Sequence, residues 1–362
     1  MGAPPPGPPA GCAPWPGESE RGTVTSTRAT ATALTETGAG AQPPAGGATQ
    51  RGSGARERLA DRVFRNASRG AATVVLVILT AIALFLLDKA IPALSKNSAN
   101  FLTTSQWFPD NTPVVFGIAA LVYGTVVTAV LALVIAVPVA VGVAVFITQY
   151  APRRAARPLG NLVDLLAAVP SVVYGLWGLV YLVPHMAKFS KWLADYFGWI
   201  PIFKSDGVFG KSIFVASLVL AIMILPVISS ITREVIRQVP GDHKEAALAL
   251  GATKWEMIRT SVLPYSRPGI ISAVVLGFGR AIGETIAVAL VLSANYTITA
   301  HVLTPGGNTI AANIANTFGD AGDTGRGALI ASGLVLFIIT LAVNFGARAI
   351  VARRKEFRGA AA

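Results

Sequence analysis

The chain has 362 residues, of which 53% are hydrophobic and 13% charged, and its mean hydropathy is +0.59. A charged fraction near half that of soluble proteins, with this much apolar content, excludes an ordinary soluble domain and predicts an integral membrane protein. The formal net charge is +12, and Lys and Arg gather between apolar runs, which favours anionic lipid headgroups over nucleic acid as their partners. The single cysteine, Cys12, excludes an internal disulfide framework.

The sequence offers no pattern for catalysis or metal binding. The three histidines fall in separate connecting segments and share no metal-ligand spacing (His185, His243 and His301). Gly210-Lys211-Ser212 ends like a phosphate-binding loop, but Ser205 stands where that motif requires its first glycine. We therefore expect this chain to bind no metal, no nucleotide and no cofactor, and to carry no catalytic residue.

Residues 1–54 are rich in Pro, Gly, Ala and Thr and offer almost nothing to bury, which predicts a disordered cytoplasmic tail. Residues 55–69 place Leu59 and Val63 on one side of a short basic helix. We expect this amphipathic helix to lie at the interface with the inner headgroups. It leads into the first predicted membrane span, 71–91, which has no charged residue before Asp88.

The next uncharged run, Asn111 to Pro152, exceeds the roughly 20–25 residues that one crossing needs. It would form either one long helix bent at Pro138 or two spans. Two spans would place the following arginines, and the later polar loop, outside (Arg153, Arg154 and Arg157). Charge therefore favours one long helix.

Four further apolar runs bring the prediction to six spans: 161–183, 213–231, 269–293 and 327–350. Six spans place both termini on one side of the membrane. That side carries 22 of the 30 Lys and Arg residues and the opposite loops carry six, so the positive-inside rule predicts cytoplasmic N- and C-termini in a multi-pass plasma-membrane protein. The transmembrane domain would cover residues 70–352, followed by a cytoplasmic tail, 353–362.

The cytoplasmic connection 232–268 contains a polar segment, Glu245–Pro264, between two spans. The run Glu-Ala-Ala-Leu-Ala-Leu favours helix, and Gly251 is a natural helix stop. Thr253 is suited to cap a second short helix with Glu256, three residues later. The pattern predicts a helix–glycine–helix hairpin on the membrane surface, a shape that docks into a groove on a partner.

This segment resembles the coupling loop of ABC-importer permeases, in which Glu-Ala-Ala is followed after three residues by Gly and after nine more by Ile-x-Leu-Pro. Six positions are in register (Glu245, Ala246, Ala247, Gly251, Leu263 and Pro264). Ser261 stands at the Ile position with Val262 beside it, so one apolar anchor is missing or displaced. In that family the loop seats in an ATPase subunit. The alternative is an ordinary amphipathic loop between two spans.

The fifth predicted span contains Arg280 and Glu284, four residues apart and therefore on one face of a helix. Each charge at that depth costs about 2.5–3.5 kcal/mol on insertion scales. Two such costs on one face favour a water-filled path or a partner that lines it. A guanidinium at that depth suits transient contact with an oxyanion, which it can bind in a bidentate way. A structural ion pair that neutralises itself is the alternative. Gly279 and Gly283 would let another helix approach closely.

Asp164 lies near the cytoplasmic end of the third predicted span. We interpret it as an interfacial or first-turn carboxylate rather than as part of a path. The prolines inside the spans allow bends where broken backbone can line a cavity, and they serve equally as simple kinks (Pro138, Pro170 and Pro226).

Three strings narrow the resemblance: LGFGRAIGETIAVALV after the coupling loop, VDLLAAVPSVVYGLWG on the third span and LAIMILPVISSITREV on the fourth. They are similar to the PstC family, permease subunits of phosphate-specific ABC importers, over residues 70–355. The resemblance implies an all-α membrane protein with the six-helix architecture of type I (MetI-like) importer permeases. The partners it implies are a PstA-like second permease subunit, two ATPase subunits that carry ATP and Mg, and an extracytoplasmic phosphate-binding protein.

From this resemblance, Arg280 and Glu284 match the charged pair of the transport path, and Glu245–Pro264 matches the ATPase contact. Three hydroxyl groups would be available to phosphate oxygens (Thr285, Ser171 and Tyr174). ATP binding in the partner subunits would open the path outward, and hydrolysis would reset it. The chain itself would be a transport subunit and not an enzyme.

Other functions remain open from the residues alone. The nearest alternative is the same class of transporter with another oxyanion as its cargo, such as sulfate or molybdate. An ion-coupled secondary carrier would use Arg280 and Glu284 as a proton-linked site, but the coupling loop disfavours it, because a carrier has no ATPase to dock. A membrane-bound sensor scaffold would signal through residues 1–54.

Overall fold

The computed structural model describes residues 53–359. The chain divides into two units after Ala67, and the packing described below belongs to the second, Ser68–Ala362. Helix α1 runs from Ser53 to Lys96, so it contains both the predicted segment 55–69 and the first predicted span. The surface location of residues 55–69 stays a prediction, and nearly all of the predicted tail 1–54 lies outside the described residues.

Within the described residues, six helices are long and apolar enough to cross a membrane, which confirms the predicted number. They cover residues 62–96, 119–150, 171–197, 213–237, 254–283 and 323–346. Two of the predicted spans, the fourth and the sixth, are single helices that run longer than predicted: α6 (Ile213–Arg237) and α12 (Asp323–Gly359).

The long uncharged run folds as one helix, as its flanking charges predicted. Helix α2 (Ala119–Val145) continues through a π-helical turn, Phe146–Tyr150, and contains Pro138. It starts at Ala119 rather than at residue 111, because β1 (Trp107–Phe108) and β2 (Val115–Phe116) form a short antiparallel hairpin before it. Asn97 holds that hairpin: its side chain donates to the Phe116 carbonyl at 2.7 Å and accepts from the Phe116 amide at 3.2 Å.

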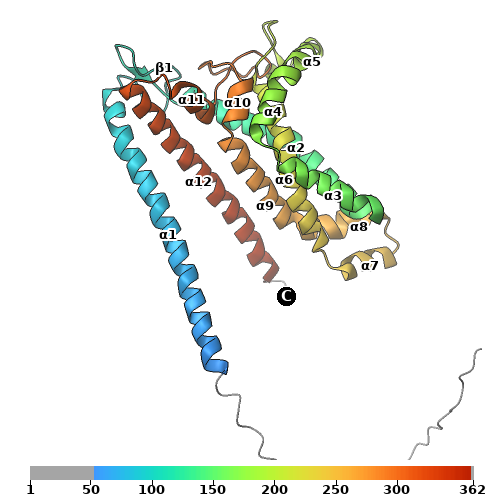
Figure 1. Ribbon diagram of the computed structural model, residues 1–362. Helices are drawn as coiled ribbons and strands as arrows, with labels where there is room; N and C mark the ends of the chain where they lie inside the picture. The colour runs from blue at the N-terminus through green and yellow to red at the C-terminus, as the bar shows by residue number, and fades with distance from the viewer. Residues whose placement is uncertain (1–52, 360–362) are drawn as a thin grey trace, which may run out of the picture. The chain divides into compact units, whose positions relative to one another are not determined.

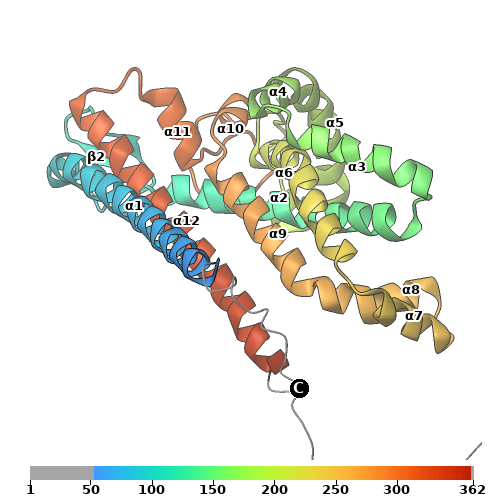
Figure 2. The same cartoon turned by 60° about the horizontal axis from the view of Figure 1, so that its bottom comes forward.

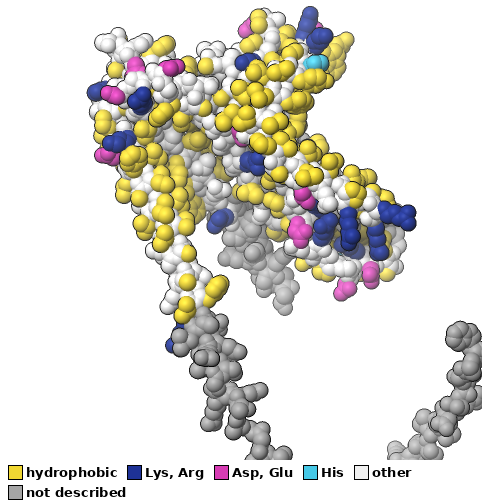
Figure 3. All heavy atoms as spheres, viewed as in Figure 1, with side chains coloured by type: hydrophobic (Ala, Val, Ile, Leu, Met, Phe, Trp, Pro, Cys, Tyr) yellow, Lys and Arg dark blue, Asp and Glu magenta, His cyan; other side chains and the backbone are white. Residues whose placement is uncertain are grey.

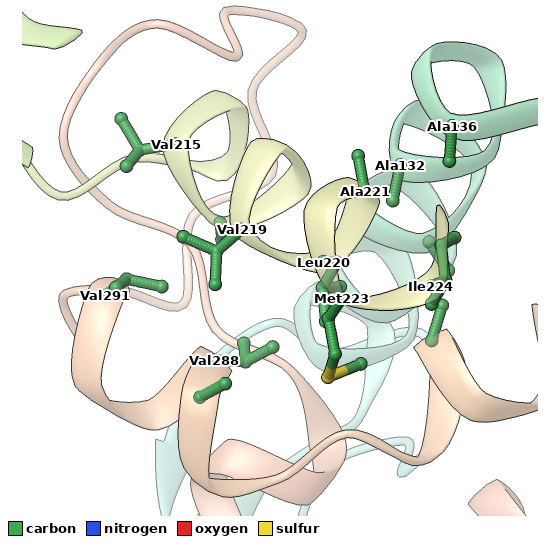
Figure 4. Packing of buried hydrophobic residues seen from close by; sticks show 14 of the residues in the cluster. Ala132, Ala136, Val215, Val219, Leu220, Ala221, Met223, Ile224, Val288 and Val291 are labelled. Atoms are coloured by element: carbon green, nitrogen blue, oxygen red, sulfur yellow. The ribbon is translucent and has the colours of Figure 1, made fainter. Parts of the chain in front are cut away.

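The core lies between α2, α6 and α9 (Leu263–Gly283), which lie side by side in both ribbon views (Figures 1 and 2). Alanines recur every four residues along α2 and are completely buried (Ala132, Ala136, Ala140 and Ala144). Such small residues let two helix backbones approach closely. Figure 4 shows Ala132 and Ala136 facing Ala221 and Ile224 of α6, with Val288 and Val291 of α10 (Ile286–Val291) packed nearby.

The third predicted span, 161–183, does not form one continuous helix. Helix α3 (Arg153–Ala167) ends before Pro170, and α4 (Ser171–Trp177) begins after it. Proline lacks an N–H and disfavours helical backbone in the residue before it, so the chain breaks there. From α4 the helix continues through a π-helical turn, Gly178–Leu182, into α5 (Val183–Phe197), and this 171–197 stretch is the candidate span.

The fifth predicted span, 269–293, is also broken. Helix α9 ends at Gly283, Glu284 takes an extended conformation (φ −70°, ψ 127°), and α10 starts two residues later. Arg280 and Glu284 therefore do not lie on one face of one helix, which corrects the geometry expected from their spacing.

Different elements lie at the two ends of the second unit. The loop with α7 (Gly241–Ala249) and α8 (Lys254–Met257) lies at one end, and α5, α10 and α11 (Ile310–Thr317) lie toward the other (Figure 1). We call the first of these the coupling-loop end. Lys and Arg side chains gather at this end, beside a surface of hydrophobic side chains (Figure 3).

Candidate functional site

The two helix breaks are brought together because the helices that follow them pack closely. A Cβ at Gly175 of α4 would lie 2.7 Å from the Ala287 Cα of α10, and one at Gly178 would lie 2.7 Å from Val219 and 3.1 Å from Val291. A real side-chain carbon almost never approaches another atom so closely, so these contacts require glycine. The breaks before α4 and before α10 therefore lie next to each other.

Tyr174 stabilises the end of α3 at the first break. Its hydroxyl donates a hydrogen bond to the Leu166 carbonyl oxygen at 2.9 Å. In a continuous helix that carbonyl would accept from the amide four residues later, which is the missing N–H of Pro170. The Leu166 carbonyl also accepts from the Val169 amide at 3.3 Å, so the phenol is its second donor, in place of the amide that proline removes.

Arg280 lies in the last turn of α9 and is exposed. It lies at the second break, and α10, which follows that break, packs against α4, the helix that contains Tyr174. Within the described residues, no ion pair joins Arg280 to Glu284, so the self-neutralising pair is not formed. Instead a Glu284 carboxylate oxygen accepts a hydrogen bond from the Ala287 amide at 3.3 Å, in the first turn of α10.

The remaining predicted hydroxyls lie at the same two breaks. The Thr285 hydroxyl donates to the Gly283 carbonyl at 3.2 Å, and Ser171 opens α4 one turn before Tyr174. The first turn of a helix has free backbone amides and the positive end of its dipole. A guanidinium beside such a half-helix start suits an anion. Among the described residues, no group of three or more His, Cys, Asp or Glu is placed to hold a metal.

The coupling loop is a helix–glycine–helix hairpin, as predicted. After α7, Gly251 adopts φ +83° and its amide bonds to the Leu248 carbonyl at 3.0 Å, while the Ala252 amide bonds to the Ala247 carbonyl at 3.2 Å. This is the Schellman ending, which favours glycine. The predicted capping box is also confirmed: the Thr253 hydroxyl accepts from the Glu256 amide, and the Glu256 carboxylate accepts from the Thr253 amide.

The displaced apolar anchor of the coupling motif is Val262. A π-helical turn, Ile258–Val262, places one extra residue in the helix, so Val262 is completely buried while Ser261 is half-buried. Val262 joins a cluster that fixes the loop to the ends of α2 and α6 (Ala144, Val145, Ile236, Val239, Met257 and Ile258). Leu263 and Ala247 pack against the same cluster, and Pro264 lies in the first turn of α9.

The outer surface of the hairpin carries apolar side chains that the motif does not specify. Leu250 is 89% exposed and Trp255 is 57% exposed, with Leu248 next to them in the chain. Glu245 and Ala246 are exposed on the same helix, α7. The signal in the sequence was the presence of large apolar residues inside a polar loop.

Two ring contacts tie this hairpin to the membrane helices. The Lys254 ammonium lies 4.9 Å from the centre of the Tyr150 ring, at the end of the α2 helix. The His243 and Tyr265 rings lie 5.9 Å apart and connect α7 to α9. These two contacts join the hairpin to the ends of two membrane helices.

Residues 136–356, more than half of the chain, match the family model described as "Binding-protein-dependent transport system inner membrane component". The chain belongs to this family. This permease is 46% identical over 298 residues to "Phosphate transport system permease protein PstC 2" of Mycobacterium tuberculosis, a match that covers 81% of this chain and 92% of the relative. It is 43% identical over 307 residues to PstC of Xylella fastidiosa, covering 83% and 94%.

Among solved structures, the permease is similar to a chain of a bacterial ABC transporter that imports the acidic polysaccharide alginate. That match has a TM-score of 0.48 and 19% identity and covers 80% of this chain and 99% of the other. A chain of the inward-facing MetNI methionine ABC transporter matches with a TM-score of 0.43 and 19% identity, covering 66% and 94%. Family membership makes the permease a membrane transport subunit, with no enzymatic role of its own.

Proposed function

We propose that this permease forms one half of the membrane path of an ATP-driven importer of inorganic phosphate. The observation that carries the proposal is Arg280, which lies at the junction of two broken helices and is not neutralised by Glu284. The relatives of this permease in Mycobacterium and Xylella are phosphate transport permeases by name. A tetrahedral oxyanion suits a guanidinium, which presents several donors in a fixed plane.

In the proposed path, Arg280 binds phosphate transiently and the Ser171 hydroxyl donates a further hydrogen bond. The Tyr174 and Thr285 hydroxyls would donate to phosphate only after releasing the carbonyls of Leu166 and Gly283. Glu284 keeps negative charge near Arg280 without pairing with it, which prevents the site from becoming a permanent anion trap. Half-helix starts that point at an anionic substrate are a recurring arrangement in transporters.

The partner subunits of the proposed importer are suggested by surfaces that this chain leaves open. Leu276 of α9 is 56% exposed, and a Cβ at Gly279 or Gly283 would meet no described atom within 4 Å. We propose that a PstA-like second permease packs along this face of α9 and completes the path. The apolar outer surface of the coupling loop would seat in one of two ATPase subunits, which carry ATP and Mg. The family description also requires a binding protein, here one for phosphate outside the membrane.

We propose that the coupling-loop end lies in the cytoplasm, together with both termini. The connections that would share this side hold 22 of the 30 Lys and Arg residues, and the positive-inside rule places such loops in the cytoplasm. ATP binding would then draw the coupling loops together and open the path outward to the loaded binding protein, and hydrolysis would reset it.

The test uses the complete transporter, with both permeases and both ATPases in proteoliposomes, and its binding protein outside. Labelled phosphate should accumulate only with ATP, and excess sulfate or molybdate should not compete. Competition by sulfate or molybdate with equal strength would reassign the cargo. Uptake driven by a proton gradient without ATP would contradict an ATP-driven importer and support the ion-coupled carrier.

A further inference from the structure

Arg233 of α6 is the one buried charged residue among the described side chains. Its side chain is 7% exposed, and its Nη2 donates to both carboxylate oxygens of Asp164 in α3, at 2.7 and 2.9 Å. Ser230, one turn earlier in α6, donates to the same carboxylate at 2.9 Å. Asp164 lies in the last turn of α3, which corrects its interpretation as a first-turn carboxylate, while its interfacial location stays a prediction.

The surroundings of Arg233 are shaped to hold a guanidinium. A Cβ at Gly160 of α3 would collide with the Arg233 Nη1, so a larger residue there would make the guanidinium shift. Nη1 is buried and has no hydrogen-bond partner within the described residues. The Asp164 side chain is 50% exposed, and an ion pair that solvent reaches usually contributes little stability, so stability alone does not account for it.

The location of the pair suggests what it does. Arg233 lies one turn before the end of α6 at Arg237, and α7 of the coupling loop begins at Gly241. Asp164 lies two residues before Leu166, whose carbonyl accepts the Tyr174 hydroxyl at the break. The pair is therefore a polar connection between the helix that enters the coupling loop and the helix that ends at the candidate path.

We propose that the Arg233–Asp164 pair makes α3 move with α6, so that displacement of the coupling loop reaches the break at Pro170. Both are positioning residues: neither touches the cargo, and they act through Leu166 and Tyr174. This inference rests on the proposed function, because it assigns the route by which the ATPases move the path.

The pair stays charged at neutral pH. Partial burial raises the pKa of the Asp164 carboxyl, but hydrogen bonds from Arg233 and Ser230 and the Arg233 charge outweigh that effect and hold the pKa below its ordinary value. The connection should therefore not depend on pH near neutrality.

The test compares the phosphate transported per ATP hydrolysed in reconstituted complexes of wild type and two variants. Asp164→Leu with Arg233→Met replaces the pair by apolar side chains and leaves no unpaired buried charge. Gly160→Ala keeps both charges and displaces the guanidinium. In both variants ATP hydrolysis should continue while phosphate transported per ATP falls by about tenfold, within the usual range of coupling factors. An unchanged ratio in the apolar pair variant would overturn the proposal.

Glu234→Gln is the matched control. It removes a carboxylate from an exposed pair with Arg237, 3.9 Å away, on the same helix and next to Arg233. Arg237 is retained because its charge also acts on Asp164. The control should keep the wild-type ratio of phosphate to ATP, and a loss equal to that of the two variants would overturn the assignment to Arg233.

A distance measurement tests the joint movement of α3 and α6 without relying on phosphate transport. Cys12 is replaced by Ser, and spin labels are placed at Leu162 of α3 and at Gln238, the residue that caps the end of α6, both exposed. The label distance should be the same with and without ATP when the pair is intact, and should change on ATP binding in the apolar pair variant. The same response of the label distance to ATP in the intact protein and in the apolar pair variant would overturn the proposal. Wild-type complexes that hydrolyse ATP without transporting phosphate would contradict only the proposed function.

Discussion

The hydroxyl of Tyr174 replaces the amide that Pro170 lacks, by donating a hydrogen bond to the Leu166 carbonyl at 2.9 Å. This bond spans the break between α3 and α4 and lets two half-helices meet inside an apolar protein. Arg280 ends the neighbouring broken helix, α9, and α10 beyond it packs against α4. The same hydroxyl carries the structural bond and the proposed contact with phosphate, so its removal tests both roles together.

Tyr174→Phe keeps the ring and removes the hydroxyl. The Leu166 carbonyl then keeps the Val169 amide as a donor and loses one ordinary hydrogen bond, which costs about 0.5–1.5 kcal/mol. We expect a lower unfolding temperature and slower phosphate uptake, both measured on the purified complex. Tyr181→Phe is the control, since that ring lies on the same continuous helix and is 53% exposed. Equal uptake by the two variants would mean that the break does not need the hydroxyl.

Gly175→Ala tests the contact that holds the two breaks together. The added Cβ would meet the Ala287 backbone and force α4 away from α10, at a cost of about 1–3 kcal/mol for overpacking. We expect reduced phosphate uptake at an unchanged amount of assembled complex. Gly142→Ala in α2 adds the same methyl where no atom lies within 4 Å, and it should be neutral or slightly stabilising. Full activity of Gly175→Ala would contradict the claim that the path requires close contact between α4 and α10.

Hydropathy and charge gave the number of spans and the single long helix of α2, but not the backbone breaks. An apolar run indicates that a segment lies in the membrane, but it does not indicate whether the helix there is continuous. Pro170 was recognisable as a bend, whereas the stop at Gly283 depends on packing of α10 against α4. The donor that makes the first break tolerable, Tyr174, is eight residues from Leu166 and follows only from the folded structure.

The coupling loop was the most predictable part, because its signals are local. Gly251 and the Thr253–Glu256 capping box act within a few residues of themselves. Only the anchor was ambiguous, since the extra residue of a π-helical turn moves the buried position from Ser261 to Val262. The Asp164–Arg233 pair joins residues 69 apart, and no local pattern connects them.

Leu250→Asp tests the outer surface of the coupling loop. Leu250 is 89% exposed, so the substitution should leave the fold of the permease unchanged. Placing a charge in an apolar docking contact should sharply reduce the amount of ATPase subunit that copurifies with the permease. Leu102→Asp, at a leucine 64% exposed outside the coupling loop, should copurify normally. Normal copurification by Leu250→Asp would place the ATPase contact elsewhere.

Gly251→Ala tests whether the turn between α7 and α8 orients the loop. An L-residue at φ +83° costs roughly 1–2 kcal/mol, so the loop should distort and lower ATPase stimulation by the loaded binding protein. Gly207→Ala is a closely matched control, because Gly207 has φ +84° and, like Gly251, open space around it. Both variants should lose similar stability, and only Gly251→Ala should lose ATPase stimulation. A loss of stimulation in both would assign the effect to stability alone.

The most direct test of the account is phosphate uptake by Arg280→Gln, with ATP hydrolysis followed in the same proteoliposomes. Arg267→Gln is the control, since Arg267 is also exposed on α9. The account predicts that Arg280→Gln loses uptake while ATP hydrolysis and subunit assembly are retained, and that Arg267→Gln resembles wild type. Wild-type uptake by Arg280→Gln would contradict a transport path built around this arginine.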